Sequence, residues 1–185
     1  MKTIHINEQF KEDWNRVLNH IANLFYEDSV IQFTKDGANM SISFEHGIAD
    51  DYTISTAAKL IVDGQEFTSS YSIGYATEGT EKEQSIRMKR ALSHVMLDVL
   101  EQYTGMTQQW GILTGVRPTK LYHKFRKEGL SEEQIFEKLK TDFRLSDLKI
   151  NLLKEIVARQ LHVIPDLDEL GREISIYIGV PFCPT

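Results

Sequence analysis

Apolar residues near the start of the chain recur every three or four positions, which places them on one stripe of a helix. The stripe follows a short strand-like stretch at residues 2–6 and comprises Phe10, Trp14, Val17, Leu18, Ile21, Leu24 and Phe25. Asn7 is a favourable residue to cap such a helix at its N-terminus. The pattern therefore predicts a short strand followed by a long helix from residue 7 to about residue 27.

The period changes to two between residues 29 and 77, as expected for strands with one buried face. Asp36-Gly37 and Asp63-Gly64 each separate two such runs. An Asp-Gly pair between alternating runs is a strong hairpin signal. This part of the chain predicts two hairpins, and so about four antiparallel strands.

A second long helix is predicted after the strands. Thr80-Glu81-Lys82-Glu83 has the form of a capping box, in which the first and fourth side chains bond to each other's backbone amides. Apolar positions continue to about Tyr103, ahead of Gly105. Residues 1–105 are thus expected to form an α+β accessory domain, with an antiparallel four-to-five-stranded sheet packed against two long helices.

Residues 106–164 are predicted to form a small all-helical subdomain. Pro118 suits the first turn of a short helix that ends near Lys127. A capping box and a hydrophobic staple at residues 130–135 open a second helix, and Ser146 starts a third. Residues 165–185 would supply a linker and one more strand, which divides the chain into three parts.

Composition narrows the setting of the protein. The 185 residues include 21 basic and 27 acidic side chains, a net charge of −6, and this acidity argues against an obligate nucleic-acid binder. A single cysteine rules out an internal disulfide and favours a reducing, cytoplasmic location. No apolar run approaches the length of about 18–20 residues that a membrane span requires.

The last predicted strand raises the main question about chemistry. Residues 174–180 read ISIYIGV, an almost continuous apolar run that is typical of a strand covered on both faces, as in a parallel sheet. Cys183 follows at the carboxyl end of this strand, where parallel α/β proteins place their ligand sites. From the pattern alone, the simpler interpretation makes Cys183 a small buried side chain and Tyr177 an aromatic that fills core space.

The stretch Tyr177-Ile178-Gly179-Val180-Pro181-Phe182-Cys183 resembles the start of the radical S-adenosylmethionine (SAM) signature in the oxygen-independent coproporphyrinogen III oxidase family, where Pro-Phe-Cys continues as C-x3-C-x2-C. The stretch WGILTGVRPTK at residues 110–120 resembles a region upstream of that signature in a subgroup of the family. The resemblance implies the N-terminal region of such a protein, interrupted inside the cluster motif. Residues 165–185 would be the linker and first strand of its radical SAM domain.

For the full-length protein, the resemblance implies an enzyme of heme biosynthesis that oxidatively decarboxylates coproporphyrinogen III to protoporphyrinogen IX. Cys183 would be the first ligand of a [4Fe–4S] cluster, which an electron donor would reduce, and Tyr177 would lie near the cluster and SAM. No catalytic residue is assigned within this chain. Because one thiolate cannot hold three irons of a cluster, the chain by itself is expected to bind no cofactor and to be inactive.

A cationic helix face is the candidate binding site within the chain. Lys120, Lys124 and Lys127 fall at i, i+4 and i+7 and so lie on one side of a predicted helix, with Arg117 just before its first turn. The candidate anion-binding residues are Arg117, Lys120 and Lys124. Such a face could bind the carboxylates of a tetracarboxylate porphyrinogen or RNA phosphate, and the simpler interpretation is a solvated helix face. A second basic group is also interpreted as a solvated helix face, and it comprises Arg87, Lys89, Arg90 and His94.

Two alternatives to the oxidase stay open. Related proteins of the same superfamily deliver heme and do not decarboxylate a porphyrinogen. Alternatively, residues 1–160 form an accessory module that binds RNA or a partner protein, with nucleic acid the less expected ligand. The remaining histidines have no metal-ligand spacing: they are His5, His20, His46 and His162.

Overall fold

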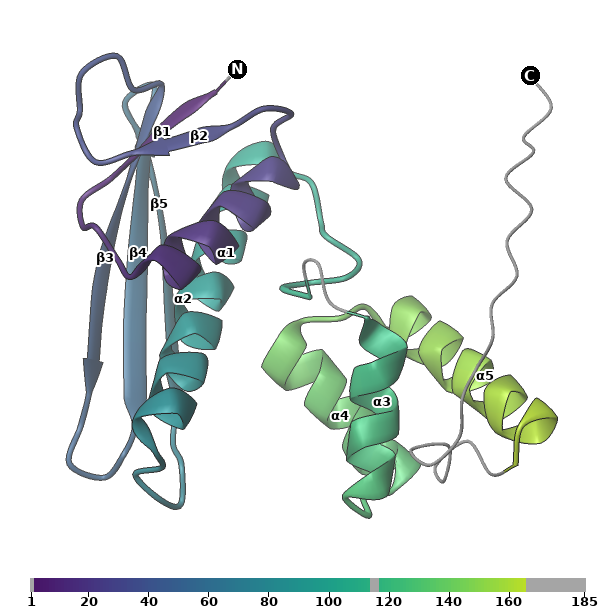
Figure 1. Ribbon diagram of the computed structural model, residues 1–185. Helices are drawn as coiled ribbons and strands as arrows, with labels where there is room; N and C mark the ends of the chain where they lie inside the picture. Colours follow the sequence, from purple (N-terminus) through teal and green to yellow (C-terminus); the bar gives the residue numbers. More distant parts are fainter. Residues whose placement is uncertain (1, 114–116, 166–185) are drawn as a thin grey trace, which may run out of the picture.

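The computed structural model describes residues 2–113 and 117–165. Figure 1 shows a sheet that packs against two helices, beside a group of three further helices. The architecture is α+β, as the sequence predicts. The predictions for Tyr177 and Cys183 lie outside the described residues.

The strands of the described chain form one sheet. They are β1 (Thr3–Ile6), β2 (Val30–Gln32), β3 (Met40–Ile48), β4 (Ile54–Val62) and β5 (Gln65–Ile73). The order across the sheet is β2-β1-β3-β4-β5. β1 runs parallel to both of its neighbours, whereas β3, β4 and β5 are antiparallel to one another. The sheet is therefore mixed, and the prediction of an antiparallel sheet is wrong.

The parallel pair of β1 and β2 follows from the helix between these two strands. α1 (Glu12–Asn23) carries the chain from the end of β1 back to the start of β2, so both strands run in the same direction. Since β1 lies between β2 and β3, the hairpin predicted at Asp36-Gly37 does not form. The hairpin at Asp63-Gly64 is confirmed, because both residues have the positive φ angles, 51° and 76°, that a tight two-residue turn requires.

The helices of the described chain are α1, α2 (Glu81–Thr104), α3 (Pro118–Lys127), α4 (Glu132–Phe143) and α5 (Asp147–Val163). The capping boxes predicted at Thr80 and Ser131 both form. α2 has 24 residues and α1 has 12, so the prediction of two long helices is met clearly by α2 alone.

α1 begins later than predicted because Asn7 has another role. Its side-chain oxygen accepts the backbone N–H of Phe44 at 2.9 Å, and its amide nitrogen donates to the Phe44 carbonyl at 3.4 Å. Lys11 occupies the N-cap position and makes no side-chain capping bond. A short polar side chain can serve either purpose, so the sequence pattern does not distinguish them.

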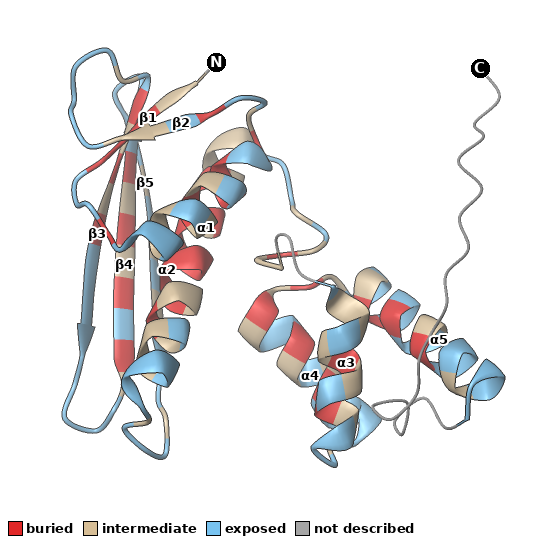
Figure 2. Cartoon of the chain, in the orientation of Figure 1, coloured by how far each residue is buried: buried red, intermediate tan, exposed pale blue. Residues whose placement is uncertain are grey.

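α1 and α2 cover one face of the sheet, and in Figure 2 the buried residues of these two helices and of the strands lie where the two layers meet. Even-numbered residues of β4 point into this core and odd-numbered residues point away from it, as the alternation of a strand requires. Core side chains with no exposed surface include Ile4, Ile21, Ile42, Leu60 and Leu97. Each such side chain contributes about 1.5–3 kcal/mol to folding by leaving water.

A second apolar cluster lies among α3, α4 and α5. It comprises Tyr122, Phe125, Ile135, Leu139, Phe143, Leu145, Ile150, Leu153 and Val157. Ile112, in the segment between α2 and α3, packs against both this cluster and the sheet core. The predicted domain boundaries near residues 105 and 165 stay predictions. None of the described helices is long and apolar enough to cross a membrane.

Candidate functional site

The predicted anion-binding residues lie together on α3. Arg117 is the N-cap residue of this helix, and Lys120 and Lys124 follow on exposed positions of its first and second turns. All three line a hollow along α3, together with Leu121 and His123. The structure therefore brings the three predicted cations to one surface, with aliphatic and imidazole groups between them.

Packing fixes the direction in which these cations point. Tyr122 and Phe125 are almost fully buried, 4% and 5% exposed, and hold the other side of α3 against α5 and α4. Lys124 also pairs with Glu128 one turn later, at 3.6 Å. Such an exposed pair contributes at most about 1 kcal/mol, so a ligand with several negative charges can compete for Lys124.

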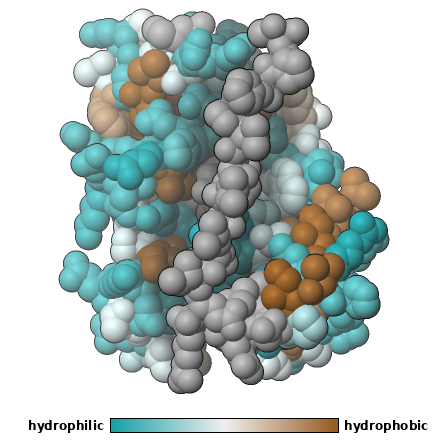
Figure 3. All heavy atoms as spheres, turned by 45° about the vertical axis from the view of Figure 1, so that its right-hand side comes forward, coloured by the Kyte–Doolittle hydropathy of each residue, from teal (hydrophilic) through white to brown (hydrophobic). Residues whose placement is uncertain are grey.

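Apolar side chains also reach the surface of the helical group. In the space-filling view of Figure 3, hydrophobic residues gather on the right-hand side, over the helical group. α5 exposes 69% of Leu148, 39% of Leu152 and 75% of Val163. The helical group thus presents a cationic face on α3 and apolar side chains on α5.

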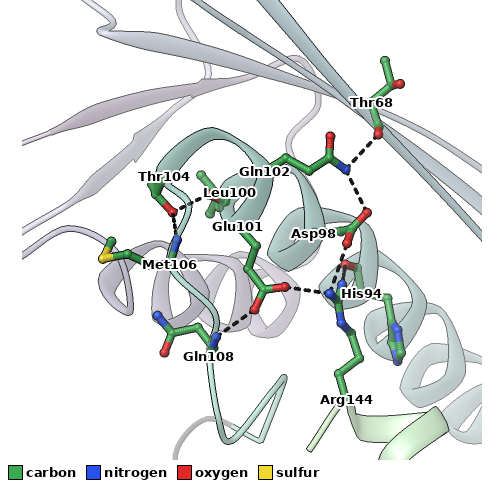
Figure 4. Close-up of polar contacts among 10 residues, drawn as sticks. All are labelled: Thr68, His94, Asp98, Leu100, Glu101, Gln102, Thr104, Met106, Gln108 and Arg144. Atoms are coloured by element: carbon green, nitrogen blue, oxygen red, sulfur yellow. Dashed lines mark hydrogen bonds and ion pairs between the residues drawn. The ribbon is translucent and has the colours of Figure 1, made fainter. Parts of the chain in front are cut away.

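A polar network joins α2 to the end of α4 (Figure 4). The guanidinium of Arg144 donates to Asp98 at 3.1 Å, to Glu101 at 2.7 Å and to the His94 carbonyl at 3.1 Å. Arg144 has a positive φ of 59°, the left-handed conformation common just past a helix end. Glu101 also accepts the backbone N–H of Gln108 at 2.8 Å. These bonds hold the helical group against α2.

A second set of contacts at this junction centres on Asp142. Arg90 donates to the Asp142 carboxylate at 3.3 Å and lies over the Phe143 ring, 4.5 Å from its centroid. Nε2 of His94 donates to the Asp142 carbonyl at 2.9 Å, since a carbonyl can only accept. Tyr71 of β5 stacks on His94 with ring centroids 4.2 Å apart. Burial lowers the pKa of His94, which favours the neutral ring at physiological pH.

Gly111 fixes the segment between α2 and α3 to the turn between α4 and α5. Its φ is +53°, and a Cβ atom at this position would lie 2.1 Å from the Phe143 carbonyl oxygen. Ile112 N–H donates to that oxygen, and Ser146 N–H donates to the Gln109 carbonyl, both at 3.0 Å. Residues 110–113, the first part of the WGILTGVRPTK stretch, therefore serve packing.

The second basic group is not a solvated helix face, so that interpretation is wrong. Arg87 lies 4.0 Å from the centroid of the Tyr75 ring and donates to two backbone carbonyls. Lys89 pairs with Asp13 of α1, and Arg90 and His94 contact the helical group. Their partners come from elsewhere in the chain, and helical spacing alone gives no signal for them.

Sequence reasoning also missed Arg144, Asp98, Glu101 and Asp142. Asp98 and Glu101 are three residues apart and share one face of α2, which was a weak signal for a basic partner. Nothing in the sequence pattern names Arg144 as that partner. Within residues 2–113 and 117–165, no group of three or more His, Cys, Asp or Glu side chains could hold a metal ion. The predictions for Cys183, Tyr177 and the cofactors stay untested.

Comparison with known proteins finds similarity to the class of oxygen-independent coproporphyrinogen-III oxidase-like proteins. One relative is the oxygen-independent coproporphyrinogen-III oxidase-like protein HemZ of Bacillus subtilis (strain 168), which is 43% identical over 173 residues. The match covers 92% of this chain and 34% of HemZ, so the chain spans about a third of the length of this relative. No family model and no solved structure matches the chain.

Proposed function

We propose that this chain is the accessory N-terminal region of a radical SAM protein of heme biosynthesis. The full-length protein would oxidatively decarboxylate coproporphyrinogen III to protoporphyrinogen IX. The observation that carries the proposal is the 43% identity to HemZ across 173 residues. The signature-like stretch at residues 177–183 also supports it, because it places a cysteine directly after a strand-like run.

The described residues do not fit a cluster site, since none of their His, Cys, Asp and Glu side chains group as metal ligands. The proposal therefore assigns the first cluster ligand to Cys183 and a position near SAM to Tyr177, both in the full-length protein. The other thiolates would come from outside this sequence, because Cys183 is its single cysteine. No reaction step is assigned to a residue of the described chain.

The accessory role proposed for the described residues is to attract and orient the substrate. Arg117, Lys120 and Lys124 line one surface of α3, and a porphyrinogen with four carboxylates is a suitable multivalent anion. Each exposed contact would contribute at most about 1 kcal/mol. Their joint effect would lie mainly in the rate of association, and it would weaken as salt is added.

The direct test of the proposal uses the full-length protein under anaerobic conditions, after reconstitution with iron and sulfide. We expect bound iron, cleavage of SAM and conversion of coproporphyrinogen, with Cys183→Ser abolishing all three. Absence of bound iron would contradict the radical SAM assignment. Iron binding and SAM cleavage without loss of coproporphyrinogen would favour a heme-delivery protein of the same superfamily.

The rival RNA-binding module has its own test. Filter binding of the 185-residue chain to RNA across a salt series distinguishes the RNA-binding module from the porphyrinogen-binding region, because phosphate contacts make RNA affinity fall steeply with salt. We expect no salt-dependent binding, because the chain carries a net charge of −6. Beyond the face on α3, the basic side chains of α2 already have partners at Tyr75, Asp13 and Asp142.

A further inference from the structure

The two edges of the sheet are built differently. β2 is the edge strand on one side and has three residues, and a very short strand is a common protection of a sheet edge. β5 is the other edge strand and has nine residues, with the sequence QEFTSSYSI. It contains no Pro, Lys or Gly, and its one charged residue, Glu66, pairs with Lys59 of β4, so the strand has little of the protection usual at a sheet edge.

Hydrogen bonds on the neighbouring strands show which backbone groups of β5 point outward. Lys59 lies opposite Thr68, and its carbonyl accepts the hydroxyl of Ser43 on β3 at 3.4 Å, so Lys59 faces away from β5. Tyr71 O accepts the Thr56 hydroxyl of β4 at 3.3 Å, so Tyr71 faces β4. Because these directions alternate along a strand, the residues whose N–H and C=O point outward are Glu66, Thr68, Ser70 and Ser72.

One side chain of the described chain reaches this outward row. Gln102 of α2 donates from Nε2 to the Thr68 carbonyl at 3.1 Å (Figure 4). Within residues 2–113 and 117–165, no other hydrogen bond uses the outward backbone groups of Glu66, Ser70 or Ser72. Among the described residues, the middle and end of β5 therefore have outward donors and acceptors without a partner, in the spacing of a strand.

A hollow of about 240 Å³ adjoins the middle of the same edge. Its described lining comprises Ser69, Ser70, Tyr71, His94, Asp98, Thr141 and Arg144. Phe67 and Tyr71 lie on the helix-covered side of β5, one on each side of Ser69, and both pack at the margin of the sheet core. A polar hollow is thus flanked along the strand by two partly buried aromatic rings.

We infer that the β5 edge binds an extended segment of a partner protein, which adds a sixth strand to the sheet. Backbone groups of the segment would bond to the outward row, which is the usual basis of strand addition. On its helix-facing side the segment would place apolar residues beside Phe67 and Tyr71 and a hydrogen-bonding residue between them, in the hollow. The site therefore recognises an apolar–x–polar–x–apolar pattern.

A second copy of the chain fits this edge less well than a single segment. In an antiparallel pair of β5 strands centred on Ser69, Thr141 and Arg144 of both copies would converge on the same small hollow. The end of α4 in each copy would therefore compete for the space beside the shared strand pair. A single extended segment brings no helix with it, so the inference commits to that occupant.

The test uses the 185-residue chain and a blocked synthetic peptide of sequence Thr-Val-Thr-Gln-Thr-Val-Thr. Amide exchange and NMR chemical shifts report the outward N–H groups one by one. We expect peptide addition to shift the amides of Glu66, Thr68, Ser70 and Ser72 and to slow their exchange at least about ten-fold. A peptide with N-methylated backbone at its threonines should do neither.

Two substitutions at one position form a matched pair. Ser70→Pro removes an outward N–H and should weaken peptide binding by at least about ten-fold, because Pro is tolerated on an edge strand but cannot donate. Ser70→Ala keeps the N–H, and residue 70 lies opposite Ala57 on the face away from the helices, so this variant should weaken binding much less than Ser70→Pro does. Thermal unfolding of both variants checks that each is folded. If Ser70→Pro does not fold, the comparison of the unmodified with the N-methylated peptide tests the role of the backbone hydrogen bonds.

Three outcomes would overturn the inference. The first is an unchanged set of edge amides at millimolar peptide. The second is slow exchange of the same amides before peptide is added, which would assign the edge to a segment of this chain. The third is a dimer in sedimentation experiments that Ser70→Pro dissociates, which would assign the edge to a second copy.

Discussion

The sheet part and the helical group of this chain are stabilised in different ways. The sheet core joins residues far apart in the sequence, such as Ile4 with Met40 and Ile42 with Leu60, and it is almost entirely apolar. The helical group buries a smaller cluster from three consecutive helices. The surface between the two is charged, with Arg90 and Arg144 facing Asp142, Asp98 and Glu101. Apolar packing therefore forms each part, and polar geometry sets how the parts are joined.

The difference bears on the proposed function. The cationic face lies on the helical group, and the open β5 edge lies on the sheet part. Arg144 contributes both to the junction and to the hollow beside β5. Substitutions that separate core, junction and surface should therefore have effects of clearly different size.

The largest effect is expected in the sheet core. Leu60→Ala removes a fully buried side chain and should lower the free energy of unfolding by about 3 kcal/mol. Its neighbour Ile61 points to the other face and is 42% exposed. Ile61→Ala should therefore change the free energy of unfolding by less than about 1 kcal/mol. Urea denaturation measures both, and equal losses would contradict the assignment of core and outer faces.

Gly111→Ala should have the next largest effect. The substitution costs about 1–2 kcal/mol for the left-handed backbone, and its Cβ would also meet the Phe143 carbonyl. Gly37→Ala is the matched control, because Gly37 has a φ of +72° and no atom lies within 4 Å of the point that an added Cβ would occupy. Denaturation should show a larger loss for Gly111→Ala. Equal losses would mean that backbone conformation alone matters at Gly111.

Arg144→Leu should destabilise the junction by about 1–2 kcal/mol. Breaking a fully buried ion pair would cost more, but the side chains here are partly exposed. Asp98 and Glu101 would lose their cation. The control Arg16→Leu removes an exposed pair with Glu12 and should cost less than about 1 kcal/mol. Amide exchange should become faster in α4 for Arg144→Leu. Unchanged exchange there would show that apolar contacts are sufficient to join the parts.

A smaller effect is expected from pH. His94 is buried beside Arg90 and Arg144, with Asp142 as the nearby acid, and burial first, then the two cations, lower its pKa. The unfolded state therefore takes up a proton at a higher pH than the folded state does. The contribution of His94 to stability is complete above about pH 6.5 and is lost as the pH falls through the lower pKa of the folded protein. Thermal unfolding at pH 7.5 and 5.5 tests this, and His94→Gln should remove the part of the pH dependence that His94 supplies.

The smallest effect on stability should come from the cationic face. Lys120→Glu should change the free energy of unfolding by less than about 0.5 kcal/mol, because Lys120 is exposed. In the full-length protein it should weaken porphyrinogen binding a few-fold at low salt, with less effect at high salt. Lys35→Glu, on an exposed loop of the sheet part, is the control. Equal effects of the two variants on binding would argue against a substrate role for α3.

Short-range sequence patterns predicted most of the helices and strands. The capping boxes at Thr80 and Ser131 and the turn at Asp63-Gly64 were readable because each is complete within a few residues. The mixed sheet could not be predicted in this way, since strand order depends on where α1 returns the chain. Asn7 illustrates the same limit, because its partner Phe44 lies 37 residues away.

Part of the candidate site could be predicted because its residues lie close together in the sequence. Arg117, Lys120 and Lys124 share a helix face by spacing alone, and the structure places them on one surface. To predict the junction around Arg144, one must know which helices pack together. The spacing of its residues along the chain does not give this information. The similarity to HemZ agrees with the family that the residues at 110–120 and 177–183 resemble.

The backbone contact at Gly111 has a practical consequence for dissecting this protein. Gln109 and Ile112 supply hydrogen bonds to Ser146 and Phe143, so the turn between α4 and α5 is completed by chain that precedes α3. A polypeptide that starts at Pro118 would contain all three helices and still lack part of its own structure. The shortest piece expected to fold as the helical group therefore begins before Gln109.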